Sequence, residues 1–330
     1  MKSFTGLGKM AYEITNNVQN EEFTKPQMEN AIRTAVADAC GGEWNYYSFM
    51  ENRYKVFAIM AEIMPITTNA SLANRFGSFA QFKDTAMGDL NYFEVEDNTL
   101  YPVCTSARGN QDIERQKIID KNFSVPTQMK TIKLYDEFDR FMAGKIDLAR
   151  LSTKVTNSYE AHVGQLIANT IYGSYSAVGS NYKTSGAFAE LALDLIIEHV
   201  KASTGTTDVQ IWGSMSALGK VVVAQGYSDR NKDVYNSLGY YGEYKGSSLF
   251  AMPQAYVAGT QTFGVERDYI IIVPASEPIV KVMFEGDAVV NMTDGMGRND
   301  MQPEFLYGRR VGASALTTAD GRYGFYKFTS

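Results

Sequence analysis

A serine-containing turn, Gly213-Ser214-Met215-Ser216, comes nearest to a catalytic motif in this sequence. It follows an apolar run that predicts a buried strand, and it precedes a helical pattern, which is the setting of the nucleophilic serine in α/β-hydrolases. The hydrolase spacing Gly-x-Ser-x-Gly is absent, because Met215 stands where the nucleophile would be. We therefore interpret Ser214 and Ser216 as residues that cap the following helix.

Other residues of types that occur in metal sites and phosphate-binding loops also lack the spacing that those sites require. The two histidines, His162 and His199, both fall within predicted helices, and no HExxH or paired CxxC motif is present. Lys183 stands four residues after Gly179, whereas a phosphate-binding loop needs Gly and Lys to be adjacent. A group of oxygen-bearing side chains consists of Asn291, Asp294, Asn299, Asp300 and Glu304. Their spacing is not that of a calcium-binding EF-hand, and a turn between strands explains them more simply. We expect no enzyme, no cofactor and no metal site.

The composition of the chain argues against several further classes of protein. The chain has 330 residues, of which 45% are hydrophobic and 21% are charged, so it can bury a large core. A net charge of −6 argues against general nucleic-acid binding, which needs a basic surface. Cys40 and Cys104 are too few for a disulfide framework. The first residues lack a signal-peptide pattern, and no run of about 18 apolar residues predicts a membrane span. The 21 Tyr and 18 Phe fit either large interfaces or an aromatic core.

The longest helical pattern runs from Asp147 to Ile171. Its apolar stripe at helical spacing consists of Leu148, Leu151, Val155, Tyr159, Val163 and Leu166. Arg150, Lys154 and Glu160 fall on the opposite, polar side. Asp147 is a good N-cap, and we expect Gly173 to end the helix in a left-handed conformation.

Two strand-like segments, 93–106 and 123–136, flank sixteen residues that are rich in charge. The charged side chains are Arg108, Asp112, Glu114, Arg115, Lys117, Asp120 and Lys121. Two strands joined in this way form a long projection, which is not stable alone in water. The projection therefore needs a surface to lie on, unless the charges simply mark a solvated loop.

The remaining elements are a polar N-terminal arm, several helices and further strands. Thr24 and Gln27 can form a capping box that opens a helix ending at Gly41-Gly42. A later helix has Leu191, Leu195, Ile196 and Val200 on its expected apolar face, together with Phe188 and Ala192. Residues 209–212 and 269–276 predict buried strands, and the C-terminal segment alternates like antiparallel strands.

This order of elements resembles the major capsid protein of tailed bacteriophages, the HK-ninety-seven fold of the α+β class. "DLARLSTKVTNSYEAHVGQLIANTI" resembles the spine helix of its peripheral domain. "VQIWGSMSALGKVV" and "LGYYGEYKGSSLFAMPQ" are similar to segments of its axial domain. "PIVKVMFEG" and "PEFLYGRRVGA" resemble the strands that return to the peripheral domain.

The resemblance implies a division of the chain into six segments. These are the N-terminal arm at 1–25, a helical part of the peripheral domain at 26–90, the extended hairpin at 91–135, the spine helix at 136–173, the axial domain at 174–274, and the returning strands of the peripheral domain at 275–330.

The same resemblance implies a structural role. The chain would form rings of six and five copies that build an icosahedral-type shell around phage DNA, with the DNA held by weak, non-specific contacts. The seven charged hairpin residues would contact neighbouring copies. A short arm implies a separate scaffolding protein and no N-terminal cleavage. A portal protein is a further expected partner, decoration proteins stay open, and no membrane is involved.

Some relatives crosslink a hairpin lysine to an asparagine of a neighbour. Lys117 and Lys121 are present, but no Asn or activating carboxylate matches, so we predict no crosslink. The expected location is the virion capsid, after synthesis and assembly in the host cytoplasm. Two alternatives remain, namely an encapsulin-like compartment that encloses protein and an α/β cytosolic enzyme with an unrecognised site.

Overall fold

The computed structural model describes residues 6–16, 23–42, 47–48, 51–56, 58–59, 72, 76–77, 80–90, 92–95, 103–105, 121–135, 148–222, 229–275, 277–293, 304–316 and 322–329. The helices are α1 (Gly6–Asn16), α2 (Lys25–Ala39), α5 (Leu148–Gly173), α6 (Glu190–Thr204), α7 (Met215–Leu218) and α8 (Asp229–Leu238). The strands are β1 (Ala80–Thr85), β2 (Tyr92–Val95), β3 (Lys121–Ser124), β4 (Gln128–Tyr135), β5 (Lys183–Gly186), β6 (Val209–Gly213), β7 (Glu243–Tyr244), β8 (Ser247–Ala251), β9 (Tyr269–Pro274), β10 (Val280–Thr293), β11 (Glu304–Ala315) and β12 (Gly324–Phe328).

A four-stranded sheet has the order β1-β10-β11-β4. Strand β1 is parallel to β10, whereas the other neighbours are antiparallel, with Tyr307 of β11 opposite Val290 on one side and Ile132 on the other. Alternation along each strand separates the two faces of this sheet. The side chains of Val282, Phe284 and Val311 lie in the main core, while Met283 points the other way into a separate small cluster.

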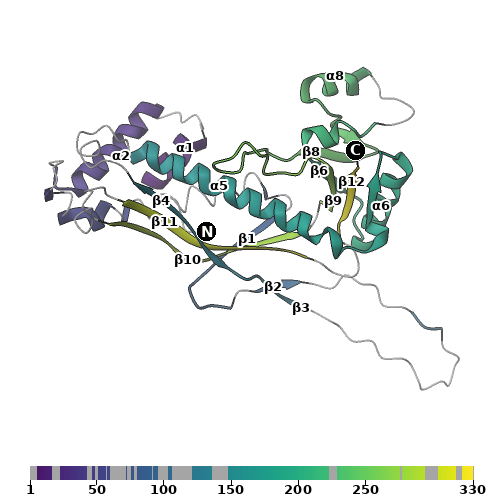
Figure 1. Ribbon diagram of the computed structural model, residues 1–330, viewed down its shortest axis with the longest axis horizontal. Coiled ribbons are helices and arrows are strands. Elements are labelled where there is room, and N and C mark those ends of the chain that lie inside the picture. Colours follow the sequence, from purple (N-terminus) through teal and green to yellow (C-terminus); the bar gives the residue numbers. More distant parts are fainter. Residues whose placement is uncertain are drawn as a thin grey trace.

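Helix α5 lies across one face of the four-stranded sheet and runs on to the six-stranded sheet at the other end of the molecule (Figure 1). Val155, Tyr159, Val163 and Ile167 bury its inner side at 2% exposure or less. At the far end, the ring of Tyr175 packs edge-on against Phe325, with 5.5 Å between the centroids. One continuous core therefore joins α5 to both sheets.

The six-stranded sheet has the order β5-β12-β9-β6-β8-β7. Helix α6 covers one face, where Ile270 and Ile272 of β9 pack with Leu193 and Val200. The other face belongs to the core around α5, since Ile271 and its neighbour Val273 lie there. Strand β9 is thus buried on both faces, as its continuous apolar run predicted.

The last strand departs from the expected division of the chain. Residues 275–330 were expected to return to the peripheral domain, and β10 and β11 do lie in the four-stranded sheet. Strand β12 instead inserts between β5 and β9 of the six-stranded sheet. Residues 80–85, which fell in a segment expected to be helical, form the edge strand β1. Pairings between distant segments set both placements, and local patterns do not contain them.

The ends of α2 were predicted correctly, whereas the end of α5 was not. The backbone N–H of Thr24 donates to Gln27 Oε1 at 2.8 Å, so the capping interaction that opens α2 is confirmed. Gly41 follows that helix with a φ of +88°, as a glycine stop requires. The prediction for Gly173 was wrong, because its φ of −61° is right-handed and the chain continues into a 3₁₀ turn at Ser174–Ser176.

The faces of two helices also differ from the prediction. In α6 the buried residues are Leu193, Ile196, Ile197 and Val200, whereas Leu191 and Leu195 face solvent at 72% and 48% exposure. The helix carries apolar residues on both sides, so periodicity alone selected the wrong stripe in part. In α5, Glu160 was placed on the polar side, yet it is buried.

Candidate functional site

A two-stranded ribbon, β2 and β3, leaves the four-stranded sheet on the face opposite α5 (Figure 1). Its root is held by a small apolar cluster in which Phe93, Val125 and Met283 are buried and Phe123 packs alongside. A ribbon of two strands is not stable by itself in water, so this cluster explains how it can form. Strands β2 and β3 both lie within residues 91–135, the segment that the resemblance to the capsid family assigns to an extended hairpin.

Two lysines add polar contacts at the root of the ribbon. Lys83 Nζ donates to the carbonyl oxygen of Tyr92 at 3.1 Å and lies 5.4 Å from the centroid of its ring. Lys281 Nζ donates to Gln81 Oε1 at 2.7 Å and lies 5.8 Å from the ring of Phe93. Burial lowers the pKa of Lys281. Cations over aromatic faces strengthen the attachment of the ribbon to the sheet.

The chain then crosses from the ribbon into β4 in close contact with β11. A Cβ atom built on Gly312 would lie 2.1 Å from the carbonyl oxygen of Pro126, so only glycine allows the two backbones to approach. The hydroxyl of Thr127 donates to the carboxylate of Glu285, and Arg310 lies 3.7 Å from the same carboxylate. The root of the ribbon is therefore fixed in both position and direction.

Beyond the ribbon root, the same face of the four-stranded sheet is open. Met129 of β4 and Val289 of β10 are 43% and 47% exposed, and Thr131 and Lys133 also face solvent. Gly308 of β11 lies between them in register, opposite Val289 on one side and Thr131 on the other. We refer to this area as the open face. It is a surface of mixed polarity beside the ribbon root.

The structure describes only one of the seven charged hairpin residues predicted as contacts. Lys121 opens β3, where its backbone pairs with Val95. Arg108, Asp112, Glu114, Arg115, Lys117 and Asp120 lie outside the described residues, as do Asp294 and Asp300 of the oxygen-rich turn. The residues of the open face and Gly312 were not selected from the sequence. The alternation of β4 and a glycine inside a strand pattern were the available signals.

The predicted spine residues lie on α5 as follows. Val155, Tyr159 and Val163 are buried, Leu166 is half-buried at the edge of the core, and Ile167 takes the deeper position. The hydroxyl of Tyr159 donates to the carbonyl oxygen of Arg309 at 3.2 Å, and burial raises its pKa. Leu148 and Leu151 belong to the first turn of α5, and their side chains lie outside the described residues.

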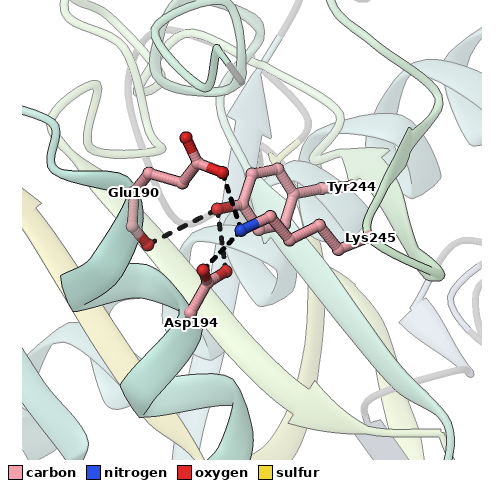
Figure 2. A network of polar contacts seen from close by, with 4 residues as sticks. All are labelled: Glu190, Asp194, Tyr244 and Lys245. Atoms are coloured by element: carbon pink, nitrogen blue, oxygen red, sulfur yellow. Dashed lines mark hydrogen bonds and ion pairs between the residues drawn. The ribbon is translucent and has the colours of Figure 1, made fainter. Parts of the chain in front are cut away.

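A polar network ties the β7–β8 turn to the start of α6 (Figure 2). Lys245 Nζ lies 2.7 Å from Glu190 Oε1 and 2.5 Å from Asp194 Oδ2. The buried Tyr244 donates from its hydroxyl to Asp194 Oδ1 at 2.9 Å. Hydrogen bonds to Asp194 and then Glu190 raise the pKa of Lys245. This network attaches the short edge strand β7 to α6, and we refer to it as the clip.

The turn itself shows why such a clip is needed. Lys245 has a φ of +45° and Gly246 a φ of +80°, as the two-residue turn of a hairpin requires. A left-handed conformation is uncommon for a residue with a side chain, and its contacts must compensate for it. The ion pairs of Lys245 supply that compensation, so the network has a structural role.

The chemical groups examined as catalytic candidates also have structural roles. Ser214 Oγ accepts from the backbone N–H of Ala217 at 3.1 Å, which confirms it as the cap of α7, and it lies 3.1 Å from Ser216 Oγ. His199 packs against the ring of Tyr182. The described part of the chain contains no group of three or more His, Cys, Asp or Glu that could hold a metal ion. None of its helices is long and apolar enough to cross a membrane.

Comparison with known proteins gives an independent view of the chain. A family described as "SPbeta prophage-derived putative capsid protein YonB" matches residues 3–303. No curated protein matches the chain.

Solved structures resemble the chain at low sequence identity. The capsid of a native GTA particle is 13% identical, with 78% of this chain and 90% of that chain covered and a TM-score of 0.54. A chain from Microbacterium phage Oxtober96 is 9% identical, with 77% and 90% covered and a TM-score of 0.50. A virus-like particle from Pyrococcus furiosus is 10% identical, with 79% and 96% covered and a TM-score of 0.45. At such identities the first two likenesses show the fold.

Proposed function

The chain belongs to the family of the SPbeta prophage-derived capsid protein YonB, and on this basis we propose how it builds a shell. It is a structural protein of the bacteriophage capsid, with the fold of phage major capsid proteins, and it is not an enzyme. Copies of the chain associate with one another to form that shell. The proposal concerns the arrangement of these copies and the surfaces that they use.

One observation carries the proposal, namely the open face next to the root of the ribbon. Buried contacts and the close approach at Gly312 fix the direction in which the hairpin leaves the sheet. The open face leaves Met129 of the edge strand β4 and Val289 of the inner strand β10 exposed, and apolar side chains gain from being covered. We infer that the hairpin of one copy lies on the open face of the next, so that each copy both covers a neighbour and is covered.

The same reasoning assigns roles to the segments of the chain. Helix α5 with the four-stranded sheet forms the peripheral domain, and the six-stranded sheet forms the core of the axial domain. Residues 1–25 were expected to form an arm, but α1 packs on α2 of its own chain, where Ile14 and Met28 are buried together, so this helix belongs to the folded subunit. Rings of six and five copies would close the shell, because contacts between different surfaces of identical subunits generate rings when the rotation closes. The crossing of β12 into the six-stranded sheet supports a rigid link between the two domains.

The proposed partners follow from this arrangement. Double-stranded DNA is the expected content, held weakly because the net charge of −6 gives the protein no general attraction for phosphates. A separate scaffolding protein and a portal would act during assembly in the host cytoplasm. The seven charged residues of the hairpin would meet complementary charges on the neighbouring copy, each exposed pair adding little but the shell repeating it in every subunit.

The decisive experiment reverses three hairpin charges, with Arg108→Glu, Arg115→Glu and Lys117→Glu made together in the full chain. We expect an unchanged melting temperature and a loss or distortion of particles in electron micrographs, because like charges would then face each other between copies. The matched control reverses Lys55, Lys154 and Lys232, which lie on other exposed surfaces and change the net charge equally. Normal particles from the hairpin variant would refute the proposed hairpin contact.

The content of the particles distinguishes a phage shell from an encapsulin-like compartment. Purified particles should hold nuclease-protected DNA when they assemble in infected or lysogenic cells. Particles that consistently enclose one host protein and no DNA would instead identify a protein compartment. A chain that remains monomeric at high concentration with scaffolding protein present would contradict both.

A further inference from the structure

We propose that two surfaces of the six-stranded sheet bind each other between copies of this chain. The first is the outer face of α6, formed by Leu191, Leu195, Glu198 and Ala202. The second is the aromatic loop at residues 252–268, which joins β8 to β9. The inference rests on the proposed shell and adds which surfaces join neighbouring copies.

The outer face of α6 has an apolar centre and an exposed carboxylate, that of Glu198, beside it. Leu191 and Leu195 are 72% and 48% exposed, and a spacing of four residues places them one above the other on the helix. The carboxylate of Glu198 lies exposed beside them, whereas those of Glu190 and Asp194 are paired with Lys245. An apolar centre surrounded by polar groups is the usual anatomy of a protein–protein interface.

The aromatic loop carries exposed rings with a positive charge beside them. Its two exposed rings, Tyr256 at 60% and Phe263 at 47%, are stacked with 5.4 Å between their centroids. The guanidinium of Arg267 lies 5.7 Å from the ring of Phe263. Tyrosine, phenylalanine and arginine are enriched in interfaces, and an arginine held over a ring is already oriented for binding.

The loop is ordered before any partner arrives. The side-chain amide of Gln254 donates to the carbonyl oxygen of Val265 at 2.9 Å and accepts from its N–H at 3.1 Å. Val265 is buried in the core around α5, so the base of the loop is anchored. A loop held in its binding conformation loses less entropy when it binds.

The charges favour contact between the two different surfaces over contact between like surfaces. Asp268 lies 3.7 Å from Lys220, and the guanidinium of Arg267 is the charge that lies over an exposed ring, that of Phe263. Two α6 faces placed together would bring Glu198 of one copy against Glu198 of the other. An α6 face placed on the aromatic loop brings leucines onto rings and Glu198 toward Arg267, which is the favourable combination.

The two surfaces lie on opposite faces of the sheet. Helix α6 packs on the side of Ile270 and Ile272, while the loop belongs to the core on the side of Ile271 and runs beside α5 (Figure 1). One copy can therefore use both surfaces at once, each with a different neighbour. Such head-to-tail contacts continue from copy to copy and close into a ring when the rotation permits.

Crosslinking inside assembled particles tests the pairing directly. Glu198→Cys and Gln261→Cys place thiols at the rims of the two surfaces, in a Cys104→Ser background because Cys104 is exposed. A short bis-maleimide should then produce a ladder of covalent multimers on a denaturing gel. The single-cysteine variants should give no ladder. A control pair, Gln261→Cys with Lys232→Cys on α8, should give none either.

A second variant tests the apolar contact. Leu191→Ser with Leu195→Ser should keep the melting temperature of the subunit and lower the yield of particles by about tenfold or more. Particles without a ladder from the rim cysteines, or a normal yield from the serine variant, would overturn the pairing and leave the proposed shell intact. If the unmodified chain forms no particles at all, the proposed function itself fails.

Discussion

The two large sheets of this protein differ in how fully their own chain covers them. The six-stranded sheet carries α6 on one face and the core around α5 on the other, so that β9 is buried from both sides. The four-stranded sheet has α5 on one face, but the ribbon root covers only part of the other and leaves Met129 and Val289 exposed. The first sheet is complete within one chain, whereas the second leaves room for another. The buried faces of both sheets thus serve folding, whereas the open face and the exposed side of α6 are left for neighbouring copies.

A cavity in the complete sheet should have the largest effect on stability. Ile272 is fully buried against α6, and Ile272→Ala should lower the free energy of unfolding by about 2–5 kcal/mol. Chemical denaturation of the unassembled subunit measures this. Leu191→Ala on the exposed side of α6 is the matched control and should stay within about 0.5 kcal/mol of the parent. Equal losses in the two variants would contradict the difference between the faces.

A smaller loss should come from the ribbon root. Gly312→Ala forces a methyl group against the backbone of Pro126 and should cost about 1–3 kcal/mol. Gly173 has open space around it and a helical conformation, so Gly173→Ala should instead stabilise by about 0.4–1 kcal/mol. Urea unfolding of both variants gives the comparison. A neutral Gly312→Ala would mean that the ribbon is not held against β11.

The clip on the six-stranded sheet predicts an effect that depends on pH. Hydrogen bonds raise the pKa of Lys245 above its ordinary value of 10.5, so the folded state holds this proton more tightly than the unfolded chain. The contribution of Lys245 to the stability of the fold is complete below that ordinary pKa. It is lost as the pH rises through the higher pKa of the folded state. Lys245→Met should therefore be less stable than the parent at pH 8, and the two melting temperatures should converge at strongly alkaline pH.

Lys232 provides the control for the clip. Its partner Asp229 is 97% exposed, so solvent screens that pair and Lys232→Met should melt like the parent at every pH. A pH-independent difference between Lys245→Met and the parent would show that packing of the side chain, and not its charge, holds β7.

The smallest effect on stability should come from the open face. Val289→Thr with Thr131→Glu changes exposed positions on two strands and should alter the free energy of unfolding by no more than about 0.5 kcal/mol. The same variant should reduce the yield of particles, because the change lies where a neighbour is proposed to bind. Thermal melting and electron microscopy of one preparation measure both. A marked loss of stability without any loss of particles would show that this face serves folding and not assembly.

Local signals in the sequence predicted much of the fold, and distant pairings explain what they missed. The caps of α2, the stripe of α5 from Val155 to Val163 and the doubly buried β9 each follow from neighbouring residues. Strand β12 joins β9 across some fifty residues of other structure, and no local pattern contains that pairing. The outer leucines of α6 were assigned to the core because periodicity reports that a helix is apolar but does not say what covers each side.

The candidate surfaces were harder to predict than the fold. A charge run such as Arg108 to Lys121 is visible in the sequence, and its contacts with a neighbour remain a prediction. The open face was not predicted, because the sequence pattern of a strand with one exposed side is the same whether water or a second subunit covers that side. The approach of Gly312 to Pro126 also depends on tertiary structure, although a glycine within a strand pattern hints at it.

The place of β12 has a consequence for the order of events during synthesis. Strands β5 and β9 leave the ribosome well before residues 324–328, yet β12 lies between them in the finished sheet. Until it arrives, the sheet is split, and Ile271 and Ile272 lack their neighbour on that side. Domains usually fold as they emerge, N-terminal parts first. A chain that ends before β12 therefore lacks the strand that joins β5 to β9, and its six-stranded sheet stays divided.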